Sequence, residues 1–261
     1  MIGYGLQLER LAVGDNFNPE LGFLRRDDMR RHFGQVRFSP RPQTPSAIRK
    51  LSWIGSLAYV EDGRGRLETR EIKGEFGIEF QNSDRLTLNY TDAYEFLEQP
   101  FNIVPTVSIP VGGYSFGLVR AVFTGGQQRS IAGNLEVEIG TFYDGHRRTV
   151  AYNRGRVELT PRLSVEPSIS LNWVDLPGAS FTTRLAGSRV TYTVTPLMFV
   201  SALLQYNTST SLVSANARLR WEYQPGSELF VVFNQERDTL SRSFPGLRNP
   251  IVVKVNRLFR F

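Results

Sequence analysis

The sequence predicts an all-β protein, an up-and-down antiparallel transmembrane β-barrel of about 14 strands. Three observations predict this fold. Polar and apolar residues alternate with a period of two in many segments. Long and short connections alternate along the chain, and the chain ends on an aromatic-rich segment. Helical periodicity is hard to find, and its best candidate is the short polar stretch Arg25–His32.

The composition excludes several classes of protein. The chain has 261 residues and no cysteine, which excludes disulfide scaffolds, thiolate zinc sites and cysteine nucleophiles. No run of apolar residues reaches the length of a membrane-spanning helix, and the N-terminal residues show no signal-peptide pattern. The net charge of +6 comes from mixed charges without a basic block, so we expect no nucleic-acid partner.

The alternation is clearest in Val213–Tyr223, where apolar residues or alanines occupy every second position and polar residues the others. The same pattern recurs in Ile72–Phe80, Leu86–Tyr90, Leu135–Thr141 and Leu163–Trp173. Fourteen strands are predicted in this way, and they begin near Ile2, His32, Lys50, Arg66, Arg85, Tyr114, Ile131, Thr149, Leu163, Ser180, Leu197, Leu212, Glu228 and Pro250.

The connections between these segments fall into two sets. One set is mostly tight: Gln81–Asp84, Thr124–Arg129, Pro161–Arg162, Thr195–Pro196 and Gln224–Ser227, with the proline-rich Ser39–Arg49 as the longer exception. The other set includes three long loops: Gly14–Arg31, Leu97–Gly113 and Arg237–Asn249. Tight turns at one rim and long loops at the other are typical of outer-membrane barrels with both termini in the periplasm.

A soluble sandwich also alternates, so the sequence must indicate which face meets water. Arg–Glu combinations on the polar face, a terminal phenylalanine and aromatic residues near strand ends favour the membrane barrel. These aromatic residues are Trp53, Tyr59, Tyr90, Tyr94, Phe96, Phe142, Tyr143, Trp173, Tyr206, Trp221, Tyr223, Phe259 and Phe261. Lipid is therefore the expected partner and the bacterial outer membrane the expected location. Closure requires the first strand, near Ile2–Leu11, to pair with the last, Ile251–Phe261.

The C-terminal residues VVKVNRLFRF resemble the signature that the barrel-assembly machinery reads in outer-membrane proteins. Val253, Val255, Phe259 and Phe261 carry the resemblance, and Arg257 departs from it. The resemblance implies that this machinery is a partner during biogenesis.

Two further stretches resemble the DUF5916 family of bacterial proteins. They are GDNFNPELGFLRRDDMRRHFGQVRFSPRP, Gly14–Pro42, and SANARLRWEYQPGSELFVVFNQERD, Ser214–Asp238. Family members typically place a family-9-type carbohydrate-binding module before a C-terminal barrel. The resemblance implies one outer-membrane barrel domain over residues 1–261, either a naturally short version or the C-terminal part of a longer protein. In the second case, missing N-terminal strands or additional subunits would complete it.

Charged residues on the polar face are the candidate lumen lining. They are Glu75, Glu79, Glu136, Glu138, Arg154, Arg156, Glu158, Arg218, Arg220 and Lys254. They would set ion selectivity in an open lumen or form a structural ladder in a plugged one. Fourteen strands enclose more space than side chains fill, so we expect the long loops to block part of the lumen.

Three other motifs have simpler interpretations. Gly113–Gly117 matches G-x-S-x-G, but a strand follows it and the only histidines are His32 and His146, so we expect a strand entry rather than a nucleophile elbow. Asp15, Asn16, Asn18 and Glu20 offer oxygen ligands for calcium, and an Asx-rich turn is the favoured alternative. The charged run Arg25–His32 suits a gate or a ligand-binding lip, and a solvated loop whose charges pair among themselves is favoured.

We therefore expect a non-enzymatic channel, transport pore or membrane anchor without a metal or other cofactor. A membrane-embedded hydrolase acting on lipid or glycan is the alternative, and it needs Ser, Asp or Glu near His32 or His146. A soluble glycan-binding sandwich is the third hypothesis.

Overall fold

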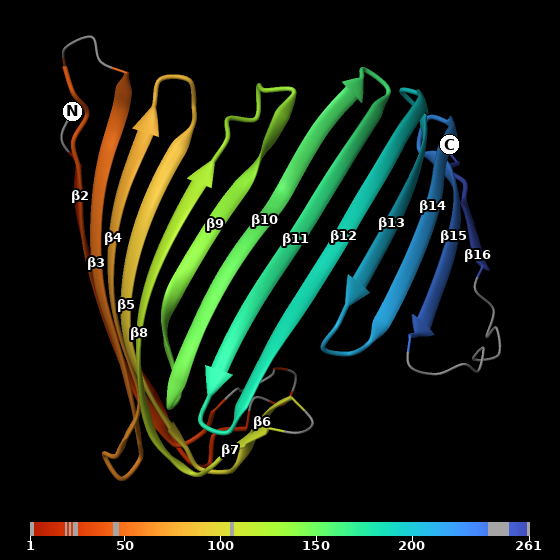
Figure 1. Cartoon of the computed structure of the whole chain (residues 1–261). Coiled ribbons are helices and arrows are strands. Elements are labelled where there is room, and N and C mark those ends of the chain that lie inside the picture. The colour runs from red at the N-terminus through yellow and green to blue at the C-terminus, as the bar shows by residue number, and fades with distance from the viewer. Residues whose placement is uncertain are drawn as a thin grey trace. The chain divides into compact units, whose positions relative to one another are not determined.

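The computed structural model describes residues 3–18, 20, 22, 26–43, 47–104, 107–239 and 251–259. These residues form an all-β protein whose main element is a 14-stranded antiparallel sheet (Figure 1). Strands that follow one another in the sequence are also neighbours in this sheet, and only the small hairpin β6–β7 lies outside it. The predicted all-β class and strand number are confirmed.

The first eight strands are β1 (Gly3–Val13), β2 (Met29–Ser39), β3 (Ile48–Asp62), β4 (Leu67–Phe80), β5 (Arg85–Leu97), β6 (Phe101–Val104), β7 (Val107–Ile109) and β8 (Gly112–Thr124). The others are β9 (Ile131–Phe142), β10 (Gly145–Thr160), β11 (Leu163–Leu176), β12 (Ala179–Thr195), β13 (Met198–Asn207), β14 (Leu212–Gln224), β15 (Ser227–Asp238) and β16 (Ile251–Asn256).

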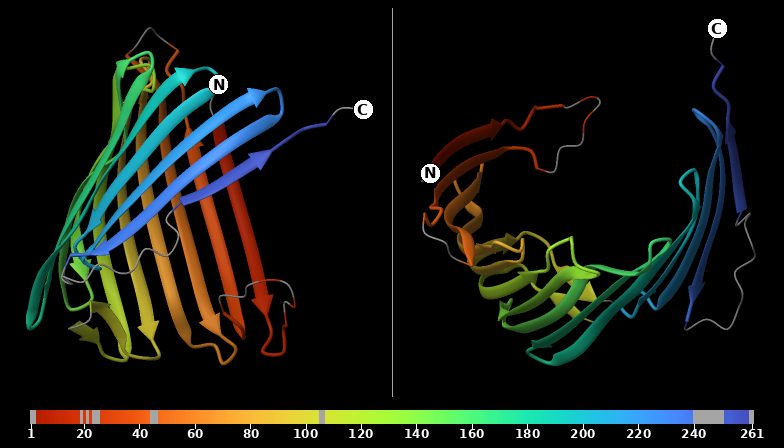
Figure 2. Two further views of the ribbon diagram at one scale, coloured as in Figure 1. Left: turned by 90° about the vertical axis from the view of Figure 1, so that its right-hand side faces the viewer. Right: turned by 90° about the horizontal axis from the view of Figure 1, so that it is seen from above.

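All fourteen predicted strands have a counterpart in the large sheet, and the starts agree within a few residues. Sequential antiparallel pairing places alternate connections at opposite ends of the strands, as Figure 2 shows from two further directions. Alternation therefore identified the strands correctly. The hairpin β6–β7 was not predicted, because its two strands are too short to show a period.

The chain divides into two compact units. Unit 1 comprises residues 1–123, 136–149 and 173–181, and unit 2 comprises residues 124–135, 150–172 and 182–261. The strands β1–β5 lie wholly in unit 1, and β13–β16 lie wholly in unit 2.

In unit 1 the registers of β1–β5 separate an apolar face from a polar face. Residues opposite each other in a register project to the same side of a sheet. One row joins Tyr4, Phe38, Trp53, Phe76 and Leu88 in consecutive strands. The rings of the first four stack or tilt against one another at centroid distances of 5.1–5.5 Å. This aromatic row ties four strands together on the apolar face.

The opposite face of the same strands is polar. One of its rows joins Gly5, Arg37, Ile54, Glu75 and Asn89, and the next joins Gln7, Gln35, Ser56, Lys73 and Thr91. The alternation in the sequence therefore becomes two chemically different surfaces of one sheet.

Unit 2 shows the same separation. On one face Val200, Leu219, Val231 and Val253 lie in a row across β13–β16. On the other face a row joins Phe199, Arg220, Phe230 and Lys254. The polar face here is mixed, because phenylalanines alternate with cations.

Few apolar side chains are buried among the described residues. The buried ones are Ile109, Tyr114, Ala132, Ala151, Val174 and Leu176. Many large apolar side chains are exposed instead, and the most exposed include Tyr4 and Leu8 at 76% each. In the described part of the chain these apolar side chains are open to the surroundings, in contrast to the covered inner faces of a sandwich.

A glycine makes room for one ring packed across strands. Gly133 has a φ of +152°, and a Cβ there would lie 2.6–2.7 Å from the ring and hydroxyl oxygen of Tyr152. The Tyr152 hydroxyl donates a hydrogen bond to the Ala132 carbonyl oxygen at 2.7 Å. Only glycine combines this backbone conformation with this close approach.

The last strand is shorter than predicted, because β16 ends at Asn256 rather than at Phe261. The pair Glu228–Asn256 is the final one, and Ser227 is the last residue of β15 beyond it. The Leu258 amide then donates to the Ser227 hydroxyl at 3.0 Å. β1 pairs with β2 and β16 pairs with β15, and these two strands stand at the ends of the described strand order.

Candidate functional site

The polar face of unit 1 carries a ladder of ion pairs between strands. Glu75 on β4 contacts Arg85 on β5 at 3.1 Å, and Glu79 contacts Arg49 at 3.2 Å. These glutamates belong to the predicted lumen lining, and each has a cation on a neighbouring strand. Strand register positions every one of these pairs, so the partners could not be read from the sequence.

The ion pairs on β8–β10 are less exposed. Arg120 on β8 donates two hydrogen bonds to Glu136 on β9, at 2.8 and 2.7 Å. Arg147 on β10 contacts Glu138 at 2.6 Å and lies over the Phe142 ring. The side chains of Glu136 and Glu138 are only 13% and 16% exposed. A two-point hydrogen bond to a partly buried carboxylate is the strongest contact in the ladder.

In unit 2 the predicted lining residues are held differently. Arg220 donates to Glu228 at 2.9 Å through Nε. The Arg218 guanidinium lies 5.7 Å from the centre of the Phe230 ring, and Phe230 also faces Lys254 across β15–β16. Arg218, Arg220 and Lys254 therefore gather around one phenylalanine.

The remaining lining residues lie on β10. Arg156 and Glu158 contact each other at 2.6 Å along the strand. Arg154 lies inside β10 with a φ of +50°, a left-handed conformation that interrupts the regular backbone of the strand.

The hairpin β6–β7 builds an apolar cluster at one end of the polar side of unit 1. Ile109, Tyr114, Val174 and Leu176 are its buried members. Partly buried residues packed against them are Leu97, Ile103, Val107, Phe116, Phe142, Tyr143 and Phe181. Tyr114, Phe116 and Phe142 share the alternation phase of Arg120 and Glu136 on their strands. The cluster therefore belongs to the face that carries the ion pairs.

The apolar cluster changes the pKa of the Tyr143 hydroxyl. Burial in the cluster raises its pKa, and the negative charge of Glu95 and the neighbouring Tyr114 raise it further. Tyr143 lies in the β9–β10 turn with a φ of +49° and packs edge-to-face against Tyr114 and Phe116 at 5.1 Å. The folded chain therefore favours the neutral form of the Tyr143 phenol.

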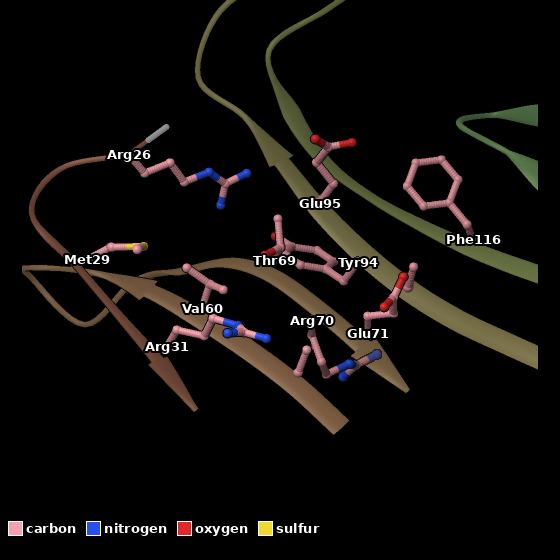
Figure 3. Close-up of a pocket in the computed structure, with 12 residues that line it drawn as sticks. Arg26, Met29, Arg31, Val60, Thr69, Arg70, Glu71, Tyr94, Glu95 and Phe116 are labelled. Atoms are coloured by element: carbon pink, nitrogen blue, oxygen red, sulfur yellow. The ribbon is translucent and has the colours of Figure 1, made fainter. Parts of the chain in front are cut away.

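A cavity of about 430 Å³ opens beside the cluster (Figure 3). Its walls come from the segment before β2 and from β2, β3, β4, β5 and β8. The charged lining residues are Arg26, Arg31, Arg70, Glu71 and Glu95. No sequence motif predicts this cavity, because its residues come from five strands and one loop.

The charged run Arg25–His32, whose last residues belong to β2, pairs differently from its prediction. Arg26 contacts Glu68 at 3.1 Å, Arg30 contacts Glu61 at 3.2 Å and Arg31 contacts Glu9 at 2.7 Å. The favoured interpretation, charges pairing among themselves, is wrong for these three arginines. The physical reason for Arg30 and Arg31 is that β2 runs between β1 and β3, which carry Glu9 and Glu61, whereas Glu68, the partner of Arg26, lies on β4. Arg25 lies outside the described residues.

The other motifs follow their simpler interpretations. Gly113–Gly117 lies inside β8 with no helix after it, so the elbow geometry is missing. His32 lies on β2 and His146 on β10.

The calcium candidates form a local turn. Asn16 donates to Asp15 at 3.1 Å and the Glu20 amide donates to the Asn18 side chain at 3.2 Å. Within the ranges that the structure describes, no group of three His, Asp or Glu residues is arranged to hold a metal ion.

The predicted assembly signal lies at the C-terminal end of unit 2. Val253 and Val255 pair with Val231 and Leu229 and are 60% and 63% exposed. Phe259 follows the end of β16, is 63% exposed, and lies under the Arg257 guanidinium. Phe261 lies outside the described residues.

The described part of the chain contains no helix with the length and apolarity needed to cross a membrane. Comparison with known proteins found no matching family model, no matching curated protein and no matching solved structure.

Proposed function

We propose that this chain is a bacterial outer-membrane β-barrel whose sheet closes by pairing of β1 with β16, and that it acts as a channel. The observation that carries the proposal is the exposed apolar face opposite a face tied by ion pairs. In water such a face is costly, at roughly 25 cal/mol for each Å² of apolar surface. Lipid removes that cost, and the polar face then lines the lumen.

The extent of the apolar face supports this placement. On β3 it runs from Leu51 through Trp53 and Leu57 to Tyr59, which shares its row with the charged or polar residues Arg10, His32 and Arg70 and so marks the end of the apolar stretch. Eight residue steps span about 26 Å along a strand. A tilt of about 40° projects roughly 20 Å of this onto the membrane normal, close to the apolar band of about 25 Å in such barrels.

The hairpin β6–β7 supports a partly obstructed channel rather than a wide one. It adds an apolar cluster to the face that would line the lumen. We expect planar-bilayer recordings of the whole chain to show small conductance steps. Replacing residues 99–110 by a short Gly-Ser linker should enlarge the steps several-fold. If both the whole chain and the linker variant insert and carry no current, the channel is rejected and the membrane anchor remains as the proposed function.

Closure of the sheet between β1 and β16 can be tested by disulfide cross-linking. The chain contains no cysteine, so introduced cysteines are the only ones that can react. We would place one cysteine at Leu6 on β1 and a second at each residue of β16 in turn, in the folded protein. An intramolecular disulfide at one or two positions of β16 is expected. Disulfides between two copies only would instead indicate that partner strands complete the sheet.

The resemblance to the DUF5916 family extends the proposal to biogenesis. It would make the chain the C-terminal barrel of a larger protein, inserted by the barrel-assembly machinery. Phe259→Ala should then slow insertion into vesicles containing that machinery. Val252→Ala serves as the control, because Val252 lies on the polar face of β16, in the row of Val232 and Arg218. Equal insertion of both variants would argue against this role.

A further inference from the structure

The cavity beside the apolar cluster has a floor of small side chains. Ala58 on β3 and Ala93 on β5 flank Glu71 in one row, and Val60 and Thr69 lie side by side in the next. Small residues surrounded by larger ones leave a recess, here about 430 Å³. This volume lies within the range of small-molecule sites.

Apart from Arg70 on β4, which contacts Asp92, its charges are separated between two walls. Arg26 and Arg31 approach from the segment before β2 and from β2, whereas Glu71 and Glu95 approach from β4 and β5. Figure 3 shows the Arg26 guanidinium and the Glu95 carboxylate on opposite sides of the Thr69 side chain. In the register Arg31, Val60, Thr69 and Glu95 form one row across four strands.

Most of these charges have a partner, and one does not. Arg26 contacts Glu68, Arg31 contacts Glu9, Arg70 contacts Asp92 and Glu71 contacts Lys73, at 2.7–3.1 Å. Each arginine still has further N–H donors, because a guanidinium carries five. The carboxylate of Glu95 makes no hydrogen bond or ion pair to another described residue. The cavity therefore offers spare donors on one wall and a free carboxylate on the other.

We propose that this cavity binds a short peptide with free termini. The peptide carboxylate would accept hydrogen bonds from Arg26 and Arg31, and its ammonium group would donate to Glu95. The small floor and the Phe116 ring would contact its backbone and side chains. The outer strands of the row are three spacings apart, about 14 Å. A di- or tripeptide of about 7–10 Å fits between the two side-chain groups.

Isothermal titration calorimetry of the full chain in detergent micelles tests the proposal. The probes are Ala-Ala, N-acetyl-Ala-Ala, which lacks the ammonium group, and Ala-Ala amide, which lacks the carboxylate. We expect Ala-Ala to bind saturably and each blocked form to bind at least about tenfold more weakly. Equal binding of the three probes, or no saturable binding of Ala-Ala, would overturn the proposal.

Variants then assign each wall. Glu95→Gln should weaken Ala-Ala about tenfold while leaving N-acetyl-Ala-Ala unchanged. Arg31→Gln should abolish the preference for Ala-Ala over its amide, and Arg31→Lys provides a folded alternative if loss of the Glu9 contact destabilises the chain. Circular dichroism checks the β content of each variant.

Matched controls lie outside the cavity. Glu236→Gln on β15 removes another carboxylate, and Arg37→Gln removes a cation from the same face of β2. Both should bind Ala-Ala as the parent does, and an equal loss in a control would overturn the assignment. Binding does not depend on a closed barrel, so a chain that binds Ala-Ala without carrying current loses the channel and keeps this site.

Discussion

The two faces of the sheet hold neighbouring strands together by different interactions. On the apolar face of unit 1 the contacts are rings in a row, from Tyr4 to Phe76. On the polar face they are ion pairs such as Arg120–Glu136 and Arg85–Glu75. Ring contacts need no exact partner, whereas an ion pair needs a particular residue on the adjacent strand. The stability of the apolar face thus depends on the medium that contacts it. The stability of the polar face depends on the strand register that brings each ion pair together.

The largest effect is expected from a charge placed on the apolar face. Leu57→Arg, near the middle of β3, should lower the free energy of unfolding by about 2–4 kcal/mol if that face contacts lipid. Ser56→Arg, the adjacent residue on the polar face, should cost well under half of that. Urea unfolding in detergent, followed by tryptophan fluorescence, measures both. Equal small effects would mean that both faces meet water.

A smaller effect is expected from opening the aromatic row. Phe38 stacks on Tyr4 at 5.1 Å and on Trp53 at 5.5 Å. Phe38→Ala should cost about 2 kcal/mol, the sum of two ring contacts and some lost burial. Phe33→Ala on the polar face of the same strand, where the ring contacts Arg31, should cost about half as much. The same unfolding measurement compares them, and the reverse order would contradict the role of the row.

Ion pairs on the polar face should differ according to their exposure. Glu136→Gln removes the two-point contact with Arg120 and should cost about 1–1.5 kcal/mol. Glu158→Gln removes the pair with Arg156, whose side chains are both about half exposed, and should cost at most about 0.5 kcal/mol. Unfolding at low and high salt sharpens the result, since the exposed pair should lose its contribution first.

The smallest effect concerns pH and the cluster under the hairpin. Because the pKa of Tyr143 is raised in the fold, the unfolded chain releases this proton at lower pH than the folded chain does. Stability should therefore fall as the pH rises through about 10, the ordinary tyrosine value. Tyr143→Phe should reduce this alkaline loss in thermal unfolding at pH 8 and pH 11. Tyr192→Phe, on β12 of unit 2, is the control and should leave it unchanged.

Much of the fold follows from local pattern, and the site does not. Alternation in segments such as Val213–Tyr223 identifies a strand and its two faces without knowledge of its neighbours. It also selects the charged residues of the polar face, including Glu136 and Arg220. It does not reveal that Glu136 meets Arg120 or that Arg31 meets Glu9, because those pairs depend on register between strands.

By itself, the sequence determined an all-β chain, fourteen strands and the residues on each face, since a period of two is a property of the backbone. Tertiary structure decided three other things: the hairpin β6–β7 packs on the polar side, β16 ends at Asn256, and a recess forms between Arg31 and Glu95. Each depends on which residues of distant segments come into contact. Long-range packing, unlike alternation, leaves no local period in the chain.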